Sequence, residues 1–376
     1  QGSRAIAIGE GALYSQNFTS ATNNYNIAIG YDAGLSVTTG LKNILIGGLA
    51  GDALTTGGNN VAIGYQAHSS DDLGSRNVAV GTEALSDMNF STATDSYNVA
   101  VGDQAGKRVT TGVQNTLMGG LAGDALTVGS YNVALGTTAL GGDTKGSKST
   151  AIGYSALVNQ NFTSATDAYN TAVGYEAGQA VTTGVNNTLI GGLAGDAITT
   201  GVQNTLLGRS AGSAMTTANN NTVVGYAAGS DITTGVDNVV VGAFAGDAIT
   251  TADSITAIGY AALTSLTTGG SNVAVGESAL SAATTGSSNT AVGRRALRYN
   301  TVGDQNTAMG FAALGNTNPA SAADTDNTAF GYLAGNAVTT GTQNTFVGSL
   351  CGDATDDGAE NTAMGYMALS ANCGDS

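Results

Sequence analysis

Apolar, polar and glycine positions recur along this chain at a short, nearly constant spacing. The recurring pattern is Asn-x-(Ala/Leu)-(Ile/Val/Leu/Met)-Gly-x-x-Ala, which first appears in degenerate form from Ala5 to Ala12. It occurs 21 times; 16 of the 20 intervals are 17 residues long and four are 21. A repeat of this period predicts a solenoid in which each unit forms one coil packed on its neighbours. Positions within a coil are numbered from the asparagine.

Three positions of the coil barely vary. Position 1 is Asn in 18 copies, position 5 is Gly in all 21, and position 8 is Ala in 20. The glycine indicates a positive φ or a site too tight for a side chain, and the alanine an interior site with room for one methyl group. The asparagine suggests a turn whose side chain bonds to the backbone and stacks on its copy. Representative residues are Asn26, Gly30, Ala33, Asn98, Gly102, Ala105, Asn170, Gly174 and Ala177.

The segments that end at the recurring glycine read as strands. Residues 170–174 are rich in β-branched side chains, and a second short segment at 180–184 also ends in glycine. Two short strands and two turns per coil predict an all-β, flattened parallel β-solenoid. At roughly 4.8 Å per coil, 21 coils would span about 100 Å.

Side-chain size at positions 3 and 6 is correlated. Leu45 is followed by Gly48, whereas Ala28 is followed by Tyr31. We interpret this as two sites sharing one limited space, with joint duplication of two unit types as the alternative. The tyrosines at position 6 are expected to form broken stacks.

Four units carry four extra residues, at 5–25, 77–97, 149–169 and 306–326. Insertions in solenoids form loops on one face. We expect one elongated repeat domain over 1–376, with a terminal coil and cap at 361–376. Exposed loop aromatics could contact glycans, or each Phe could pack on its own coil; the candidates are Phe18, Tyr25, Phe90, Tyr97, Phe162 and Tyr169.

The outward side of the strands carries an apolar ladder. Side chains alternate along a strand, so position 3 can fill the coil while positions 2 and 4 point outward, as in 238–242. The opposite assignment is also open. An aliphatic row along 21 coils exceeds the apolar patch that a monomer exposes, and burial against further copies of the chain would remove it. This favours a homo-oligomer.

Composition excludes several classes. Only 10% of residues are charged and the formal net charge is −16, without the basic stripe that nucleic-acid binding requires. No run of 18 apolar residues is present, so no membrane insertion is expected.

Catalytic chemistry has little support. The one histidine, His68, reads as a surface residue and cannot complete a Ser-His-Asp constellation. Glycan hydrolysis by paired carboxylates would need a cleft on large insertions. We therefore predict no enzyme, no metal site and no cofactor. The recurring aspartates are expected to stabilise turns and not to bind calcium; they are Asp52, Asp124, Asp196, Asp247 and Asp353.

The two cysteines lie near the end of the chain. Cys351 replaces the alanine of position 8, and Cys373 follows one coil later. Adjacent coils bring cysteines close enough for a disulfide, while two free thiols or an interchain link are the alternatives.

Units such as 170–178 resemble the head repeats of YadA-type trimeric autotransporter adhesins, and resemble still more the longer shaft repeats of phage tail fibres and tail spikes. The resemblance covers nearly the whole chain. It implies a left-handed β-roll, a parallel homotrimer, other fibre or virion components as partners, and attachment to a host-surface glycan or protein. It implies a location on the virion or at the cell surface.

A threonine row offers a different class of function. A Val-Thr-Thr-Gly sequence or a variant of it recurs in ten coils, a pattern that an ice-binding solenoid could display. Neighbouring residues of a strand face opposite sides, so one Thr per coil would be displayed. The first threonines of the pairs are Thr38, Thr55, Thr110, Thr182, Thr199, Thr233, Thr250, Thr267, Thr284 and Thr339.

Overall fold

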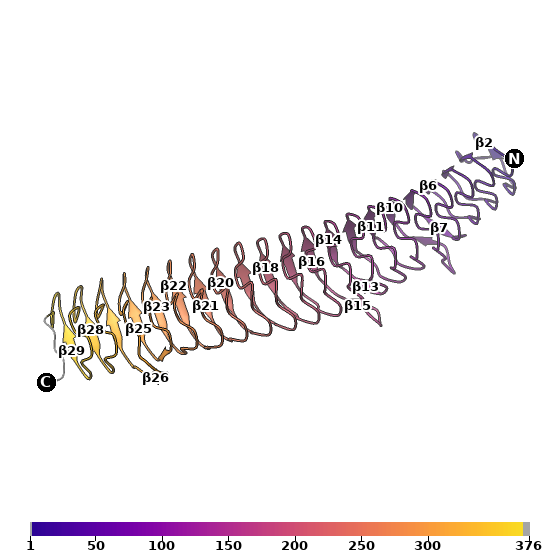
Figure 1. The fold of residues 1–376 in the computed structure, drawn as a ribbon. Helices are drawn as coiled ribbons and strands as arrows, with labels where there is room; N and C mark the ends of the chain where they lie inside the picture. The colour runs from indigo at the N-terminus through magenta and orange to yellow at the C-terminus, as the bar shows by residue number, and fades with distance from the viewer. Residues whose placement is uncertain (1, 371–376) are drawn as a thin grey trace. The chain divides into compact units, whose positions relative to one another are not determined.

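The computed structural model describes residues 2–370. Regular structure in this range is β-strand throughout, without a helix. The chain divides into two compact units, residues 1–187 and residues 188–376, and each is a parallel β-solenoid (Figure 1). The first unit has ten coils and the second has eleven, so the predicted all-β solenoid of 21 coils is confirmed.

One three-residue strand per coil builds the main ladder of each unit. In the first unit these are β2 (Ile6–Ile8), β4 (Ile27–Ile29), β5 (Ile44–Ile46), β6 (Val61–Ile63), β8 (Val78–Val80), β10 (Val99–Val101), β11 (Thr116–Met118), β12 (Val133–Leu135), β14 (Thr150–Ile152) and β16 (Thr171–Val173). In the second they are β17 (Thr188–Ile190), β18 (Thr205–Leu207), β19 (Thr222–Val224), β20 (Val239–Val241), β21 (Thr256–Ile258), β22 (Val273–Val275), β23 (Thr290–Val292), β25 (Thr307–Met309), β27 (Thr328–Phe330), β28 (Thr345–Val347) and β29 (Thr362–Met364).

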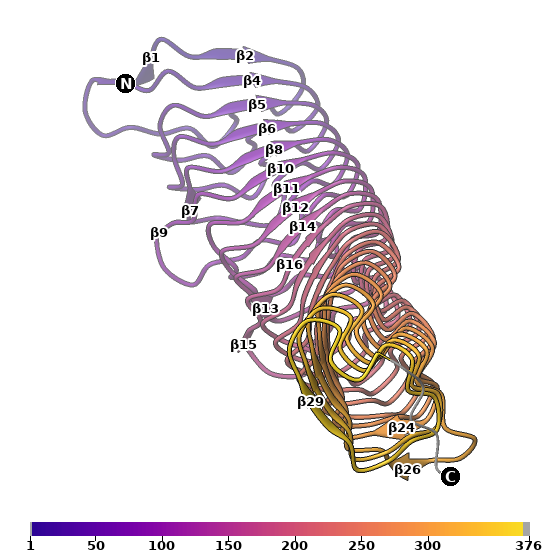
Figure 2. The ribbon, with the colours of Figure 1, turned by 90° about the vertical axis from the view of Figure 1, so that its left-hand side faces the viewer.

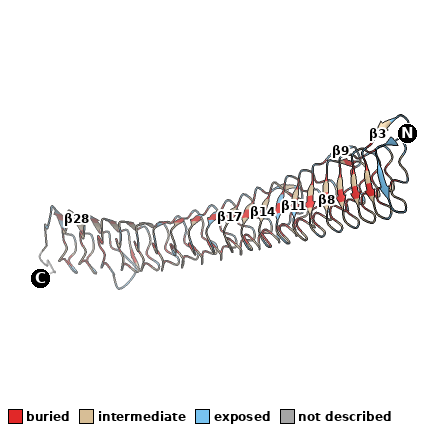
Figure 3. Cartoon of the chain, turned by 90° about the horizontal axis from the view of Figure 1, so that it is seen from above, coloured by how far each residue is buried: buried red, intermediate tan, exposed pale blue. Residues whose placement is uncertain are grey.

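Equal positions of successive coils pair in parallel. Ala28 of β4 pairs with Leu45 of β5, and Leu206 of β18 with Val223 of β19. Position 3 is buried in these strands while positions 2 and 4 are half-exposed or exposed (Figure 3). The predicted orientation, with position 3 inside the coil, is therefore correct, and the opposite assignment is wrong.

The second strand predicted for every coil is wrong. Residues 180–184 form no strand, and neither do their counterparts in the other regular coils of the described range, apart from Gly74, Gly146 and Gly303. The backbone N–H groups of Thr38, Thr39 and Gly40 all donate to the carbonyl of Thr55, at 3.0–3.3 Å. Three donors on one acceptor make a tight turn, because a strand ladder would spread its donors over alternating carbonyls.

Among residues 2–370, a second strand pair is present only at the long coils. Each pair is parallel and two residues long, and it joins the end of a long unit to the segment one coil earlier (Figure 2). The pairs are β1 (Gly2–Ser3) with β3 (Thr22–Asn23), β7 (Gly74–Ser75) with β9 (Thr94–Asp95), β13 (Gly146–Ser147) with β15 (Thr166–Asp167), and β24 (Gly303–Asp304) with β26 (Ala323–Asp324).

The recurring glycine meets both requirements that its recurrence implies. Its φ lies between 123° and 143° in all 21 coils, in the region that disfavours L side chains. A Cβ at Gly119 would also approach the carbonyl oxygen of Gly136 in the next coil to 2.5 Å. At this corner the backbones of successive coils are in direct contact.

The core is filled by positions 3, 9 and 12, and size is exchanged between positions 3 and 9. A Cβ at Gly51 would lie 2.8 Å from the side chain of Leu45, and one at Gly34 would lie 2.6 Å from it. Where position 3 is Ala, as at Ala79, position 9 can hold a buried Leu such as Leu85. Position 9 is therefore Gly wherever its own coil or the next has a large position 3.

The predicted exchange between positions 3 and 6 is wrong. Leu45 is fully buried, whereas Tyr31 points outward and is 58% exposed. A Cβ at Gly120, a position 6 glycine, would meet no atom within 4 Å. The two sites lie on opposite sides of the strand, so they share no space. The alternative of two unit types duplicated together stays a prediction.

Candidate functional surfaces

The position 1 asparagines form a hydrogen-bonded ladder inside each unit, interrupted at Ser149 in the first unit and at Ile255 in the second. The Asn26 side chain accepts from the backbone N–H of Asn43 at 2.9 Å and donates to the carbonyl of Gly40 at 2.8 Å. The Asn98 side chain does the same with Asn115 and Gly112. The side chain thus replaces the backbone partners that a turn would leave unsatisfied. The predicted backbone bonding and stacking of this asparagine are confirmed.

Position 8 is a buried corner of the coil. Ala33, Ala105 and Ala177 are fully buried, as the one-methyl interpretation predicts. Cys351 takes the same place and is buried, and burial raises the pKa of its thiol. Cys373 lies outside the described residues, so the disulfide stays a prediction.

The outward side of the main ladder carries an apolar row at position 4 in both units. Position 4 holds Ile, Val, Leu, Met or Phe throughout, and Leu135, Leu207 and Met309 are 42–45% exposed. Position 2 beside it is mostly Ile or Val in the first unit and mostly Thr in the second. We call the position 4 side chains of the main-ladder strands the aliphatic ladder.

Aromatic side chains flank this ladder at position 6. Tyr154 and Tyr175 stack at 5.5 Å between ring centroids, and Phe311 stacks on Tyr332 at 5.3 Å. Tyr226 meets Phe244, which occupies position 7 of the next coil, edge-on at 5.3 Å. The rows are short because Gly, Thr, Asp and other residues occupy position 6 of the intervening coils. The predicted stacks are present at Tyr154–Tyr175 and, with Phe311 as the partner, at Tyr332.

The long loops bury the phenylalanines that were candidate glycan contacts. Phe18, Phe90 and Phe162 are only 5–7% exposed. A Cβ at Gly146 would lie 2.9 Å from the Phe162 ring, so the ring occupies the space above that glycine. Pro319 takes the equivalent place above Gly303 in the fourth loop. Packing of each Phe back on the solenoid, the alternative named above, is what the structure has.

The loop tyrosines stay outside and lie against basic side chains. Tyr25, Tyr97 and Tyr169 are 45–53% exposed. Arg4, Arg76 and Lys148 of the preceding turns lie over these three rings, 5.0–5.5 Å from the centroids. These cation–π contacts, with the Arg76–Asp95 and Lys148–Asp167 ion pairs, fix the loop ends.

His68 is in the core and not on the surface, so that prediction is wrong. It fills position 9, where Leu otherwise stands when position 3 is small in both the same coil and the next, and it is fully buried with Asp71. Its Nε2 lies 3.7 Å from Asp71 Oδ2, beyond hydrogen-bond distance, and neither atom has another partner. Burial lowers the pKa of His68 below its ordinary value.

The equivalent coils 72 residues later surround the buried carboxylate with different side chains. Leu140 takes the place of His68, Asp143 that of Asp71, and Gln160 that of Met88. Gln160 Nε2 donates to Asp143 Oδ2 at 2.7 Å. The Oδ2 of the buried carboxylate therefore accepts from an amide of the next coil in one copy, and in the other it lies beside an imidazole of its own coil without a hydrogen bond.

The Gly-Asp-Ala aspartates converge on no common point. Burial raises the pKa of Asp52 and Asp124. Backbone N–H groups of Asp52 and Ala53 act in the opposite direction on Asp52, which agrees with a turn role. Within residues 2–370, no three His, Cys, Asp or Glu side chains lie close enough to hold a metal ion.

The two threonines of each pair face different surroundings, as the alternation of side chains along the backbone predicts. The first member donates its hydroxyl to a carbonyl of the next coil, as Thr199 does to Thr216 and Thr233 to Thr250, both at 3.1 Å. The second member is exposed. Six consecutive coils of the second unit present such a residue: Thr200, Thr217, Thr234, Thr251, Thr268 and Thr285.

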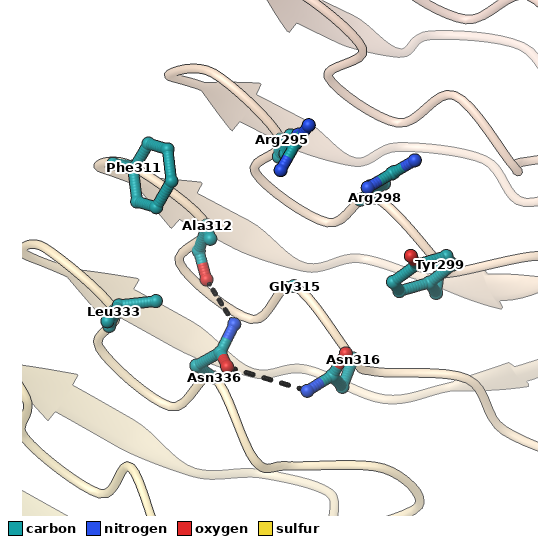
Figure 4. A pocket seen from close by; sticks show the side chains of 9 residues that line it. All are labelled: Arg295, Arg298, Tyr299, Phe311, Ala312, Gly315, Asn316, Leu333 and Asn336. Carbon is teal, nitrogen blue, oxygen red and sulfur yellow. Dashed lines mark hydrogen bonds between the residues drawn. The ribbon is translucent and has the colours of Figure 1, made fainter.

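One cleft in the second unit was not predicted as a site. It has a volume of about 190 Å³ and lies on the turns after β23, β25 and β27 (Figure 4). Its lining includes Arg295 and Arg298, part of the densest basic group of the chain. That group was visible in the sequence, but the aromatic and amide residues that join it come from two further coils.

Neither a known protein-family model nor a curated protein sequence matches this chain. No helix that could cross a membrane is present among residues 2–370. The functional interpretation therefore depends on the surfaces described above.

Proposed function

We propose that the chain is the shaft of a trimeric attachment fibre, of the kind found in phage tail fibres and tail spikes, and that it carries no enzymatic activity. It would stand on a virion or, in the adhesin alternative, on a bacterial surface. The aliphatic ladder is the observation that carries this proposal. Leu207 and Met309 are over 40% exposed, and comparable side chains accompany every strand.

The physical motive is burial of apolar area. Each 100 Å² of apolar surface removed from water contributes about 2.5 kcal/mol. A row repeated in ten or eleven coils of a unit far exceeds the few hundred Å² that a soluble monomer exposes. Three copies with their ladders against a common axis would cover it, and the regular 17-residue spacing would give all copies the same register.

A charge placed on the ladder tests this assembly. We expect Leu207→Glu to weaken association, because a carboxylate would have to be desolvated at the interface. Thr234→Glu, on the exposed threonine row, is the matched control and should leave the mass in solution unchanged. The measurement is mass by light scattering after gel filtration. Equal masses for Leu207→Glu and the unaltered chain would count against the ladder as an interface.

Ice binding is the second candidate, and the six exposed threonines of the second unit favour it. They recur at the spacing of adjacent strands, about 4.8 Å, and their neighbours' hydroxyls are occupied within the coil stack. Thermal hysteresis of a dilute solution separates the two functions. Clear activity would replace the shaft proposal, and its absence would remove this candidate.

A further inference from the structure

The cleft of the second unit exists because small side chains lie between larger ones. The coil that begins at Asn306 contributes Ala312 at position 7 and Gly315 at position 10. The flanking coils carry Arg295 and Arg298 on one side and Leu333 and Asn336 on the other (Figure 4). The depression is thus one coil wide, and its two walls differ in chemistry.

The basic wall departs from the rest of the chain. Position 10 is Asp in five other coils and basic in one other, where Lys107 is paired with Glu83, whereas the coil that begins at Asn289 has Arg298 there and Arg295 at position 7. Arg294 is paired with Glu277 at 3.0 Å. Arg295 and Arg298 have no ion pair with any acidic group of residues 2–370. From Ser278 to Ala323 the only acidic residue is Asp304.

Two uncompensated guanidinium groups in a protein of net charge −16 indicate an anionic ligand. Both are half-buried, and Arg298 lies over the ring of Tyr299 at 4.9 Å, which holds its planar group in place. A guanidinium in fixed orientation can bind a carboxylate through two parallel hydrogen bonds. The charge of the cleft is too small for a polyanion such as nucleic acid, which needs an extended basic stripe.

The other residues of the cleft suit a sugar ring. Phe311 stacks on Tyr332 with 14° between their planes, and the Arg294 guanidinium lies over the Phe311 ring at 5.9 Å, so Phe311 offers the edge of its ring to the cleft. Asn336 Nδ2 donates to the carbonyl of Ala312 at 2.9 Å and is thereby held in place. Asn316 Nδ2 lies 3.4 Å from Asn336 Oδ1, which leaves Asn316 Oδ1 free to accept from a hydroxyl. These groups offer an apolar edge and amides for hydroxyls.

We propose that this cleft binds a carboxylated sugar residue of a glycan, with Arg295 and Arg298 on the carboxylate and Phe311 against the ring. The volume of about 190 Å³ is below the roughly 300–1,000 Å³ of sites for larger ligands, so one residue would be held. The cleft occupies positions 6 to 11 of its coils and not the aliphatic ladder. The inference goes beyond the shaft function and does not depend on trimer formation.

Saturation-transfer NMR and calorimetry on the full chain test this inference. The probes are 3′-sialyllactose and digalacturonate as carboxylated sugars, with lactose and inorganic phosphate as the comparisons. We expect at least one carboxylated probe to bind with Kd below about 1 mM, and lactose and phosphate to bind at least about tenfold more weakly. Failure of both carboxylated probes, or equal binding of phosphate, would overturn the proposal.

Two variants assign the binding to the cleft. Arg295→Ala with Arg298→Ala should weaken it at least about tenfold, whereas Arg209→Ala, which removes a guanidinium beside Tyr226 outside the cleft, should not. Ala312→Leu should block the cleft without altering the fold, because Leu333 fills position 7 of the next coil at a similar φ. Unchanged binding in both cleft variants would contradict the site. Mass measured on the same samples separates loss of binding from loss of assembly.

Discussion

At the scale of single residues, each coil depends on a glycine that no other residue can replace and an asparagine that serves two coils. The glycine combines a positive φ with backbone contact to the next coil. The asparagine satisfies a backbone donor of the next coil and an acceptor of its own. Both functions involve only backbone partners, which is why they recur almost unchanged while the outward positions vary.

The adjacent residues Gly119 and Gly120 test the requirement for glycine at position 5. Gly119→Ala should lower the free energy of unfolding by at least about 2 kcal/mol, because it adds left-handed strain to a clash with the carbonyl of Gly136. Gly120→Ala is the control and should change stability by no more than about 0.5 kcal/mol, since its Cβ would enter open space. Denaturant unfolding measures both. Similar effects of the two substitutions would contradict the stacking geometry.

Removal of one asparagine tests the ladder. Asn115→Ala would leave the N–H of Asn132 and the carbonyl of Gly129 without their partners, at a cost of about 1–3 kcal/mol for each buried group. We expect faster hydrogen exchange at Asn132 and in the coils around it. Thr111→Ala, at an exposed position of the preceding coil, should leave exchange at Asn132 unchanged. Protection of that amide in Asn115→Ala would refute this function of the side chain.

His68 should make the first unit sensitive to mild acid. Because burial lowers its pKa in the folded state, the unfolded chain takes up a proton first as pH falls below about 6.5, the ordinary value. The free energy of unfolding should therefore decrease from pH 7 to pH 5. The double substitution His68→Leu with Met88→Gln reproduces the Leu140–Asp143–Gln160 arrangement and should abolish that decrease.

The single substitution at His68 helps to test whether this residue is the origin of the acid sensitivity. His68→Leu alone removes the imidazole beside Asp71 and should be less stable than the double variant at pH 7, since Oδ2 of the buried carboxylate then has neither the imidazole beside it nor the amide that Gln160 donates in the other copy. Thermal unfolding at the two pH values measures these differences. The same acid sensitivity in the double variant would show that His68 is not its source.

At the scale of the coil, the core is organised by the exchange of volume between positions 3 and 9. The exchange crosses coils, because Gly34 and Gly51 both leave room for Leu45. A single coil therefore cannot change its interior independently of its neighbour. The backbone therefore stays regular while the interior side chains vary, because a large residue at position 3 is matched by a glycine at position 9.

A double-mutant cycle in the coil that begins at Asn43 measures the exchange of volume between positions 3 and 9. Leu45→Ala alone should cost about 2–5 kcal/mol and Gly51→Leu alone about 1–3 kcal/mol, from a cavity and from overpacking respectively. The combined variant should be more stable than the sum of the two losses predicts, because it recreates the pairing of Ala79 with Leu85. Additive losses would mean that the positions do not share space.

Much of the coil could be predicted from the sequence, because its constraints repeat. The positions of Gly30, Asn26 and Ala33 predicted φ, turn bonding and burial correctly. The second strand could not be excluded, because short Thr-Thr-Gly segments suit strand and turn alike. The position of His68 could not be predicted either: it depends on knowing that position 9 is interior, and the glycines at that position concealed this. The handedness of the coils stays an expectation from the resemblance.

At the scale of the whole molecule, the candidate sites divide according to how far they depart from the repeat. The aliphatic ladder is made of repeated positions and could be predicted from their spacing. The cleft at Arg295 and Arg298 is formed by three coils, at positions whose residues differ from coil to coil. The contribution of Phe311 and Asn336 is therefore visible only in the three-dimensional structure. Recognition is therefore expected where the repeat is interrupted, and assembly where it is regular.

Mass in solution tests the central claim, the trimeric shaft, most directly. Sedimentation equilibrium over a dilution series should give about 110 kDa, three times the 36.8 kDa of one chain, at every concentration. This follows because the aliphatic ladder of each copy must be covered. A stable species of 36.8 kDa at all concentrations would contradict the claim.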